Sequence, residues 1–167
     1  MIWGIDLGVR SLSLAGLDED ELTIRSITES HPHNVRYSEV RTLAVAAATL
    51  VSEADVVFVE EPPLAGSRNI RTFLKLSELL GGLMAALPCP VHPVPVSTWK
   101  KEVAGKGSLS KDDVSLFLKQ SHPGYSALCA GDQNLIDATC IALYGQQVLN
   151  RALAWSLLDP QDKLDVR

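Results

Sequence analysis

The segment GIDLGVRSLSLAGL, residues 4–17, carries the strongest indication of the fold. Residues 2–7 predict a short buried strand and residues 12–17 a second one, with a turn between them. Residues 22–27 alternate apolar and polar side chains and predict a third strand of an antiparallel meander. Asp6 interrupts the otherwise apolar first strand, where a carboxylate is costly unless it is paired or bound to a metal.

The rest of the chain alternates helices and strands. Apolar spacing and turn residues predict a helix over residues 38–53, a strand over 56–59, a helix over 72–87 and an edge strand over 91–96. A loop is predicted over residues 100–109, followed by a helix from 111, for which Ser110 and Asp113 form an approximate capping box. A loop containing Pro123 and Gly124 then leads to a last helix from about 132 to 158. Because the fourth strand follows a crossover helix, it should pair parallel to the first.

The predicted fold class is therefore α/β, with a mixed five-stranded sheet of three antiparallel strands followed by two parallel ones. Helices should flank both faces of this sheet. We expect one domain over residues 1–158 and a C-terminal tail over residues 159–167.

Composition narrows the class of protein further. Of 167 residues, 46% are hydrophobic and 21% charged, which excludes a disordered or fibrous protein. Three cysteines without a CxxC pair favour a reducing compartment over a disulfide scaffold or a thiolate zinc site. No apolar run reaches about 18 residues. We therefore expect a cytoplasmic protein that does not contact a membrane.

Charge is distributed unevenly along the chain. The net charge is −5, yet the span 68–119 has eight basic and four acidic residues. This asymmetry is typical of a surface that faces a polyanion, and equally of an ordinary solvated face. The basic residues are Arg68, Arg71, Lys75, Lys100, Lys101, Lys106, Lys111 and Lys119.

Three acidic residues interrupt apolar elements in different parts of the chain. Besides Asp6, Glu60 ends the fourth strand and Asp137 lies near the start of the last helix. In the predicted topology these carboxylates converge at one end of the sheet. Oxygen-only ligation suits Mg²⁺ or Mn²⁺, and two such ions about 4 Å apart can support phosphodiester cleavage. The alternatives are structural: Asp6 as a turn residue, Glu60 as an exposed strand end and Asp137 as a helix cap.

Four motifs together resemble one known family. GIDLGVRSLSLAGL at 4–17, VVFVEEP at 56–62, STWKKEVAGKGSLSKDDVSLFL at 97–118 and LIDATCIALYG at 135–145 are similar in order and spacing to RuvC-type Holliday junction resolvases of the RNase H-like superfamily. The resemblance covers about residues 1–147. The short, divergent chain looks more like the phage-encoded members.

This resemblance implies a metal-dependent endodeoxyribonuclease that cuts Holliday junctions, and branched DNA such as forks and flaps, by paired nicks. Asp6, Glu60 and Asp137 would bind one or two Mg²⁺ or Mn²⁺ ions, and Lys111 would offset charge in the transition state. Phosphates of the DNA would be held by Arg68, Arg71, Lys100, Lys101, Lys106 and Lys111.

One position departs from the family pattern. The residue three before Asp137 is acidic in the family and is Asn134 here. Residues i and i+3 share a helix face, so Asn134 should point toward the cluster, although its amide carries no charge. Asp132 is the substitute ligand, provided that the helix begins after it. We expect Asn134 or Asp132 to complete a weakened second metal site.

The helix predicted over residues 72–87 is apolar around much of its circumference and contains Gly81 and Gly82. In the resembled family the equivalent helix forms the homodimer interface, and a two-fold dimer would present two active sites to the two strands of a junction. The alternative is a core helix of a monomer.

Other functions fit parts of the pattern. An RNase H-like enzyme acting on an RNA–DNA hybrid and a junction-binding protein that has lost catalysis are both open. An actin-type ATPase lobe also begins with a GIDLG-like strand, but the chain has no later DxGT-like turn. Trp99 and Tyr125 are either base-stacking or core aromatics, and His31 and His33 are loop residues.

Overall fold

The computed structural model describes residues 1–28, 38–62 and 70–157. Its centre is a five-stranded sheet in the order β3-β2-β1-β4-β5, with β1–β2 and β2–β3 antiparallel and β1–β4 and β4–β5 parallel. The strands are β1 (Ile2–Leu7), β2 (Ser11–Asp18), β3 (Glu21–Thr28), β4 (Val56–Glu60) and β5 (Val91–Val94). The predicted mixed sheet, with the fourth strand parallel to the first, is confirmed.

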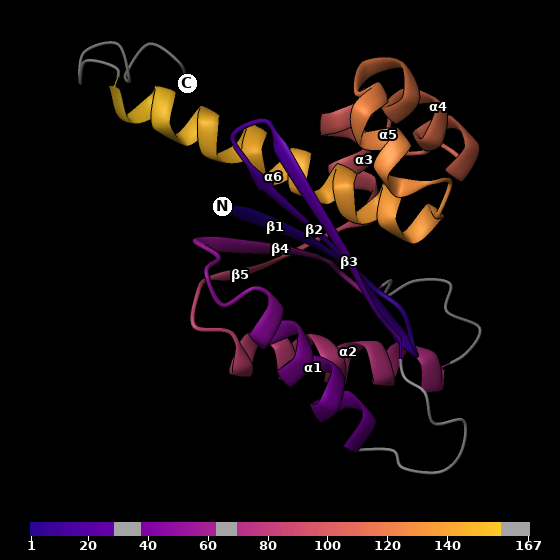
Figure 1. Ribbon diagram of the computed structural model, residues 1–167, viewed down its shortest axis with the longest axis vertical. Coiled ribbons are helices and arrows are strands. Elements are labelled where there is room, and N and C mark those ends of the chain that lie inside the picture. Colours follow the sequence, from indigo (N-terminus) through magenta and orange to yellow (C-terminus); the bar gives the residue numbers. More distant parts are fainter. Residues whose placement is uncertain (29–37, 63–69, 158–167) are drawn as a thin grey trace.

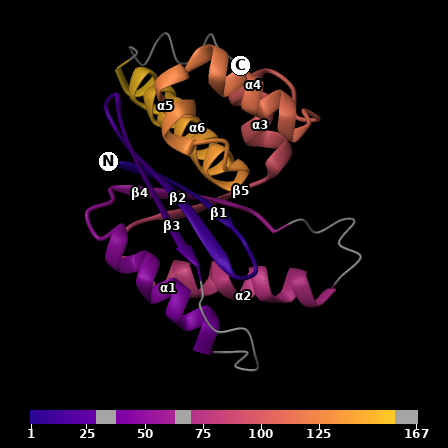
Figure 2. The same ribbon diagram turned by 45° about the vertical axis from the view of Figure 1, so that its right-hand side comes forward.

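Helices cover both faces of the sheet, as predicted (Figures 1 and 2). Two helices lie on one face, α1 (Ser38–Leu50) and α2 (Ile70–Ala86). The other face carries α3 (Val96–Ala104), α4 (Lys111–Ser121), α5 (Pro123–Cys129) and α6 (Gln133–Leu157). None of the helices in the described ranges combines the length and apolarity needed to cross a bilayer.

Two of these helices were predicted as loops, and those predictions are wrong. Residues 96–104 form α3 instead of the end of a strand and a loop, because Pro95 cannot continue a β ladder and occupies the N-cap position with φ −60°. Gly105 ends α3 with φ 85°, donating its N–H to the Lys101 carbonyl. Likewise, Pro123 occupies the first turn of α5.

Alternation along β1 divides its side chains between two cores. Trp3 and Ile5 lie in the cluster that includes residues of α1 and α2, whereas Ile2 packs against the cluster of α6. Gly4 also faces α6, and a Cβ atom there would overlap the backbone carbonyl oxygen of Ala138 and the backbone nitrogen of Ala142. The missing side chain therefore allows α6 to lie directly on β1.

A second glycine, Gly145, brings α6 close to β4. A Cβ atom at this position would overlap the ring of Phe58, which lies in the middle of β4. The helix thus rests on two neighbouring parallel strands through a glycine in the sheet and a glycine of its own. This close seating determines where the first turns of α6 lie relative to the carboxyl ends of β1 and β4.

Candidate active site

Asp6 and Glu60 lie side by side at the carboxyl ends of the parallel strands β1 and β4. The register pairs Ile5 with Val59, so the next residue along each strand is one of these acids. Asp6 has the same parity as Gly4, and Glu60 has the same parity as Phe58, so alternation directs both toward α6.

Asp137 comes from the second turn of α6, one residue before the point where that helix touches Gly4. Its side chain is only 8% exposed. The neighbouring Ile136, Ala138 and Ile141 are buried in the core on this face of the sheet. Because these apolar neighbours pack into the core, the Asp137 carboxylate is held in a nearly buried position with little access to water.

The three carboxylates repel one another and bind protons more tightly than free carboxylates do. Burial, followed by the charges of Glu60 and Asp137, raises the pKa of Asp6 to about 7. Burial and the charge of Asp137 raise the pKa of Glu60, and burial raises the pKa of Asp137. Each of the three pairs therefore interacts electrostatically, although the residues are up to 131 positions apart in sequence.

No basic side chain within the described ranges forms an ion pair with Asp6, Glu60 or Asp137. Two neutral groups contact them instead. The Trp99 indole Nε1 donates to Glu60 Oε2 at 3.3 Å, and the Gln133 amide Nε2 donates to Asp137 Oδ1 at 2.8 Å. These hydrogen bonds lower the pKa of each acceptor against the larger effect of burial. The cluster thus keeps its negative charge uncompensated by direct contacts.

This donor set fits a hard divalent cation. All three groups supply carboxylate oxygens, the ligands that Mg²⁺ and Mn²⁺ prefer, and a cation would relieve the repulsion that raises the pKa of Asp6. Across residues 1–28, 38–62 and 70–157, no three His, Cys, Asp or Glu side chains are already gathered tightly enough to enclose an ion. Binding would therefore require the carboxylates to draw closer together.

Asp132 caps α6. Its Oδ1 accepts from the backbone N–H groups of Asn134 at 2.9 Å and Leu135 at 3.3 Å, and the helix begins at the following residue. The condition under which Asp132 was predicted to reach the cluster is thus met, and its charge raises the pKa of Asp6. Asn134 is exposed. The amide that contacts Asp137 belongs to Gln133 and not to Asn134.

Lys111 is the first residue of α4 and is exposed. Its position is set by a capping box in which Ser110 and Asp113 bond reciprocally, as the sequence predicted. The charge of Lys111 lowers the pKa of Asp6, Glu60 and Asp137 alike. A single ammonium therefore acts on all three carboxylates without forming an ion pair with any of them.

The remaining basic residues of the prediction differ in their surroundings. Lys100 is half-buried on α3, and its Nζ donates to the Leu109 carbonyl at 2.8 Å, which closes the loop between α3 and α4. Lys101, Lys106 and Arg71 are exposed. Arg68, His31, His33 and the predicted tail 159–167 lie outside the described residues.

The two singled-out aromatic residues have structural contacts. Trp99 is completely buried and belongs to the core, which leaves no face for a base to stack on. The Tyr125 hydroxyl donates to the Asp20 carbonyl at 2.9 Å, and its ring stacks on His122 with centroids 5.3 Å apart. Of the alternatives left open, the core position is therefore correct for Trp99.

Sequence reasoning missed Gln133 and the role of Trp99 beside Glu60. Gln133 precedes Asp137 by four residues, a spacing that places two side chains on one helix face and was a usable signal. Ser115 of α4 extends the contact, because its hydroxyl proton is shared between Gln133 Oε1 at 2.9 Å and the Lys111 carbonyl at 3.0 Å. The approach of Trp99 to Glu60 had no comparable signal, because α3 was not predicted.

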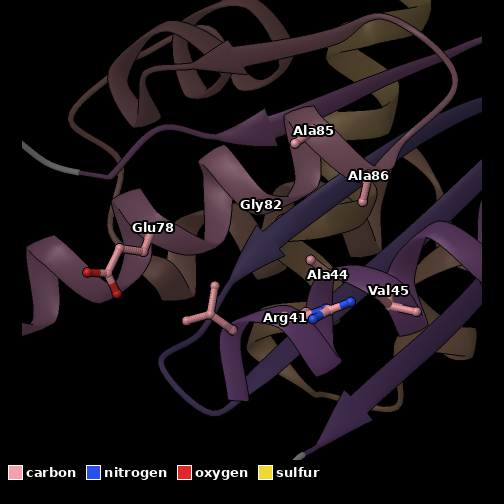
Figure 3. Close-up of a pocket in the computed structure, with 8 residues that line it drawn as sticks. Arg41, Ala44, Val45, Glu78, Gly82, Ala85 and Ala86 are labelled. Carbon is pink, nitrogen blue, oxygen red and sulfur yellow. The ribbon is translucent and has the colours of Figure 1, made fainter. Parts of the chain in front are cut away.

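A groove of about 450 Å³ lies on the opposite face of the sheet, between α1 and α2 (Figure 3). Figure 3 shows Ala44 and Val45 of α1 and Gly82 and Ala85 of α2 along it, and Arg41 and Glu78 are its charged members. This lining offers small and apolar groups and no cluster of acids. The groove is suited to packing and not to the chemistry of the carboxylates.

Comparison with known structures identifies the fold. No protein-family model and no curated protein matches the sequence. RuvC of Thermus thermophilus is similar in structure, with a TM-score of 0.63 and 21% identity over 86% of this chain and 91% of that one. The same RuvC in complex with Holliday junction substrate gives a TM-score of 0.66 and 20% identity over 86% and 90%.

The chain therefore has an RNase H-like fold, the class that the resemblance of its four sequence motifs implied. Within that class its architecture is of the RuvC type, from the antiparallel meander to the long helix that crosses β1. At this level of identity the likeness defines the fold, and the activity rests on the site residues of the chain itself.

Proposed function

We propose that the protein is a metal-dependent, structure-selective endodeoxyribonuclease that cleaves Holliday junctions and other branched DNA by paired nicks, in recombination or phage DNA processing. The observation that carries this proposal is the cluster of Asp6, Glu60 and Asp137, which is buried, mutually repelling and free of ion pairs within the described residues. The RuvC-type fold and the junction DNA bound by the Thermus protein support the choice of substrate.

In this proposal Asp6, Glu60 and Asp137 hold one or two Mg²⁺ or Mn²⁺ ions, with Asp132 or Asn134 completing the second position. The bound ion would supply a Lewis acid for the scissile phosphate and a lowered pKa for the attacking water. Lys111 places a positive charge beside the carboxylates, where it can stabilise the negative charge that develops on the phosphate. The burial of Asp137 limits the access of bulk water.

Backbone phosphates of the DNA would contact basic residues on the helices and loops next to the sheet. Lys101 and Lys106 are exposed around the end of α3, and Lys111 opens the next helix. Arg71 on α2, the half-buried Lys100 and Arg68, which lies outside the described residues, complete the proposed set. Such contacts position a duplex without reading its sequence.

The proposed enzyme is a homodimer through α2. That helix exposes Ile70, Leu74 and Met84, which are 69%, 50% and 51% accessible. The groove between α1 and α2, which Gly82, Ala85 and Ala86 line on the α2 side, can accept apolar side chains of a second copy (Figure 3). Analytical ultracentrifugation should show a dimer for the wild type and a monomer for Leu74→Glu. A monomeric wild type at micromolar concentration would contradict this part of the proposal.

A catalytically impaired junction-binding protein is the second candidate. Asn134 supplies no charge, and the acids are not gathered into a closed three-ligand site across the described ranges. Both observations would suit a chain that keeps the DNA surface but binds metal weakly. An RNase H-like nuclease acting on an RNA–DNA hybrid remains within the same fold class.

The experiment that tests the proposal is incubation of the purified protein with end-labelled four-way junction, fork, flap, linear duplex and RNA–DNA hybrid, each with Mg²⁺, Mn²⁺ or EDTA. We expect paired nicks in the junction that require the metal. Asp6→Asn should reduce nicking by about 1,000-fold or more while leaving junction binding intact. Asp20→Asn, which changes an exposed acid in the β2–β3 turn, is the matched control.

The outcomes separate the candidates. Binding of junctions without nicking at any metal concentration would identify a binding protein, and preferential cleavage of the hybrid would identify an RNase H-like enzyme. An Asp6→Asn variant that nicks as fast as the wild type would show that the carboxylate cluster is not the catalytic site.

A further inference from the structure

We infer that Trp99 and Gln133 are positioning residues of the carboxylate site, each using a neutral N–H donor to hold one oxygen of a carboxylate and leave the other free for a divalent cation. This inference rests on the proposed function in treating Glu60 and Asp137 as cation ligands. It assigns a role to two residues that neither the acidic pattern nor the basic pattern of the sequence includes.

Trp99 reaches Glu60 because of the way β5 passes into α3. Val94 pairs with Glu60 in the parallel register, and Pro95 starts the helix immediately afterwards. One turn later, the Trp99 side chain is completely buried, and its Nε1 lies 3.3 Å from Glu60 Oε2. An indole can only donate, so without Glu60 this buried N–H would have no acceptor. The bond therefore fixes the carboxylate and the ring together.

Gln133 holds Asp137 from within α6 and is itself oriented from α4. The Gln133 amide nitrogen donates to Asp137 Oδ1 at 2.8 Å, and Gln133 Oε1 lies 2.9 Å from Ser115 Oγ, whose single proton is shared between this oxygen and the Lys111 carbonyl at 3.0 Å. The opposite amide orientation would set a carbonyl oxygen against the carboxylate and is unfavourable. Ser115 lies one turn after Lys111, so this chain of bonds also ties the helix that carries Lys111 to Asp137.

The neutrality of both donors matters for cation binding. A lysine or arginine in the same place would orient the carboxylate but cancel the charge that attracts a metal ion. Trp99 and Gln133 take one oxygen each, and no other hydrogen bond to Glu60 or Asp137 forms within the described residues. Groups that orient metal ligands in this way commonly change metal affinity by about 10- to 100-fold when removed.

The test is Mn²⁺ binding without DNA, measured by the electron paramagnetic resonance signal of free Mn²⁺. Gln133→Leu and Trp99→Phe should each raise the dissociation constant by about 10-fold. Gln133→Lys keeps a donor but adds a charge and should weaken binding at least as much. In nicking assays, the Mg²⁺ concentration for half-maximal rate should rise in the same variants, while the rate at saturating metal is largely restored.

The chain offers a matched control for each variant. Gln146→Leu removes the same side chain from the same helix, where it bonds the Glu19 carbonyl at 3.0 Å, and should leave Mn²⁺ affinity unchanged. Trp3→Phe shortens another buried indole, whose Nε1 has no partner among the described residues. Circular dichroism melting shows which variants fold. If Trp99→Phe does not fold, Gln133→Leu still tests the inference, because Gln133 is only half-buried.

Wild-type affinity for Mn²⁺ in the Gln133→Leu and Trp99→Phe variants would overturn the inference while leaving the nuclease proposal intact. Weakened Mn²⁺ binding in a protein that never nicks DNA would support the inference and refute the proposed activity. A wild-type chain that binds no Mn²⁺ would overturn the inference.

Discussion

The two faces of the sheet are made from the same strands but differ in what they bury. Toward α1 and α2, β1 presents Trp3 and Ile5 to an entirely apolar core. Toward α6, the same strand presents Gly4 and then Asp6, and β4 presents Phe58 and then Glu60. Both faces bury an apolar core, but the α6 face in addition buries carboxylates, and their desolvation and mutual repulsion oppose folding.

This difference shows how period-two alternation lets one strand serve two purposes. Because neighbouring residues point to opposite faces, an acid of the candidate site can follow a core residue directly without disturbing its packing. A slip of one residue in the β1–β4 register would exchange the faces and bury Asp6 among the leucines of α2. Packing on the α1–α2 side therefore protects the placement of the site on the α6 side.

Gly4→Ala should have the largest effect, and it should act on the α6 face of the sheet. The new Cβ would overlap backbone atoms of Ala138 and Ala142, which cannot rotate away, so α6 must move off β1. We expect a loss of about 3 kcal/mol in the free energy of unfolding, measured by urea denaturation. Nicking should be lost as well, because Asp137 moves with the helix.

Leu83→Ala is the matched control on the opposite face. Leu83 is a completely buried residue of α2, and its truncation should also cost about 3 kcal/mol by leaving a cavity. Mn²⁺ affinity should nevertheless stay at the wild-type value. If Gly4→Ala were as stable as the wild type, α6 would not rest on β1 at this glycine.

The pH dependence of stability should show a smaller effect of the buried acids. The pKa of Asp6 is raised in the folded chain to about 7, so its contribution to stability is fully present below the unfolded-state pKa near 4 and is lost as pH rises through 7. In EDTA, the free energy of unfolding should fall by about 2 kcal/mol between pH 5 and pH 8.

Two comparisons isolate the source of this pH dependence. Asp6→Asn should flatten the decline, and Mg²⁺ at pH 8 should restore stability, because in the proposed function the ion binds the folded carboxylate cluster and not the unfolded chain. A decline that runs in parallel in the wild type and in Asp6→Asn would assign the effect to other groups.

Gly81→Ala should have the smallest effect and the opposite sign. A Cβ atom at Gly81 meets nothing within 4 Å, so the substitution adds no clash on the α1–α2 side. Alanine favours a helix interior over glycine, and we expect the free energy of unfolding to rise by up to about 1 kcal/mol. Thermal unfolding measures this shift, and a loss of stability would mean that α2 is packed more closely at Gly81 than the structure shows.

Much of the fold could be predicted because the signals are local. The buried run at β4 and the capping box at Ser110 each act within a few residues, and β4 and α4 formed where expected, whereas β5 ends at Val94, two residues earlier than predicted. The prediction failed at α3 and α5, where prolines that end one element also begin a helix. Short helices of this kind have too few turns to show an apolar period.

The residues of the candidate site likewise fall into those that the sequence predicted and those that it did not. The acids Asp6, Glu60 and Asp137 were identified because a carboxylate among apolar residues is conspicuous in the sequence. Trp99 and Gln133 were not identified as their partners, because a tryptophan in a core helix and a glutamine near a helix start have ordinary explanations of their own. Their contacts depend on how α3 and α4 pack against β4 and α6.

Local patterns were enough to predict the strands, their order and the positions of the acids, because alternation, prolines and buried charges act through neighbouring residues. Which groups face those acids depends on the folded arrangement. The seating of α6 on Gly4, the approach of Trp99 to Glu60 and the bond from Gln133 to Asp137 follow from contacts between distant segments. Such contacts depend on shape and close packing in three dimensions, which no local pattern encodes.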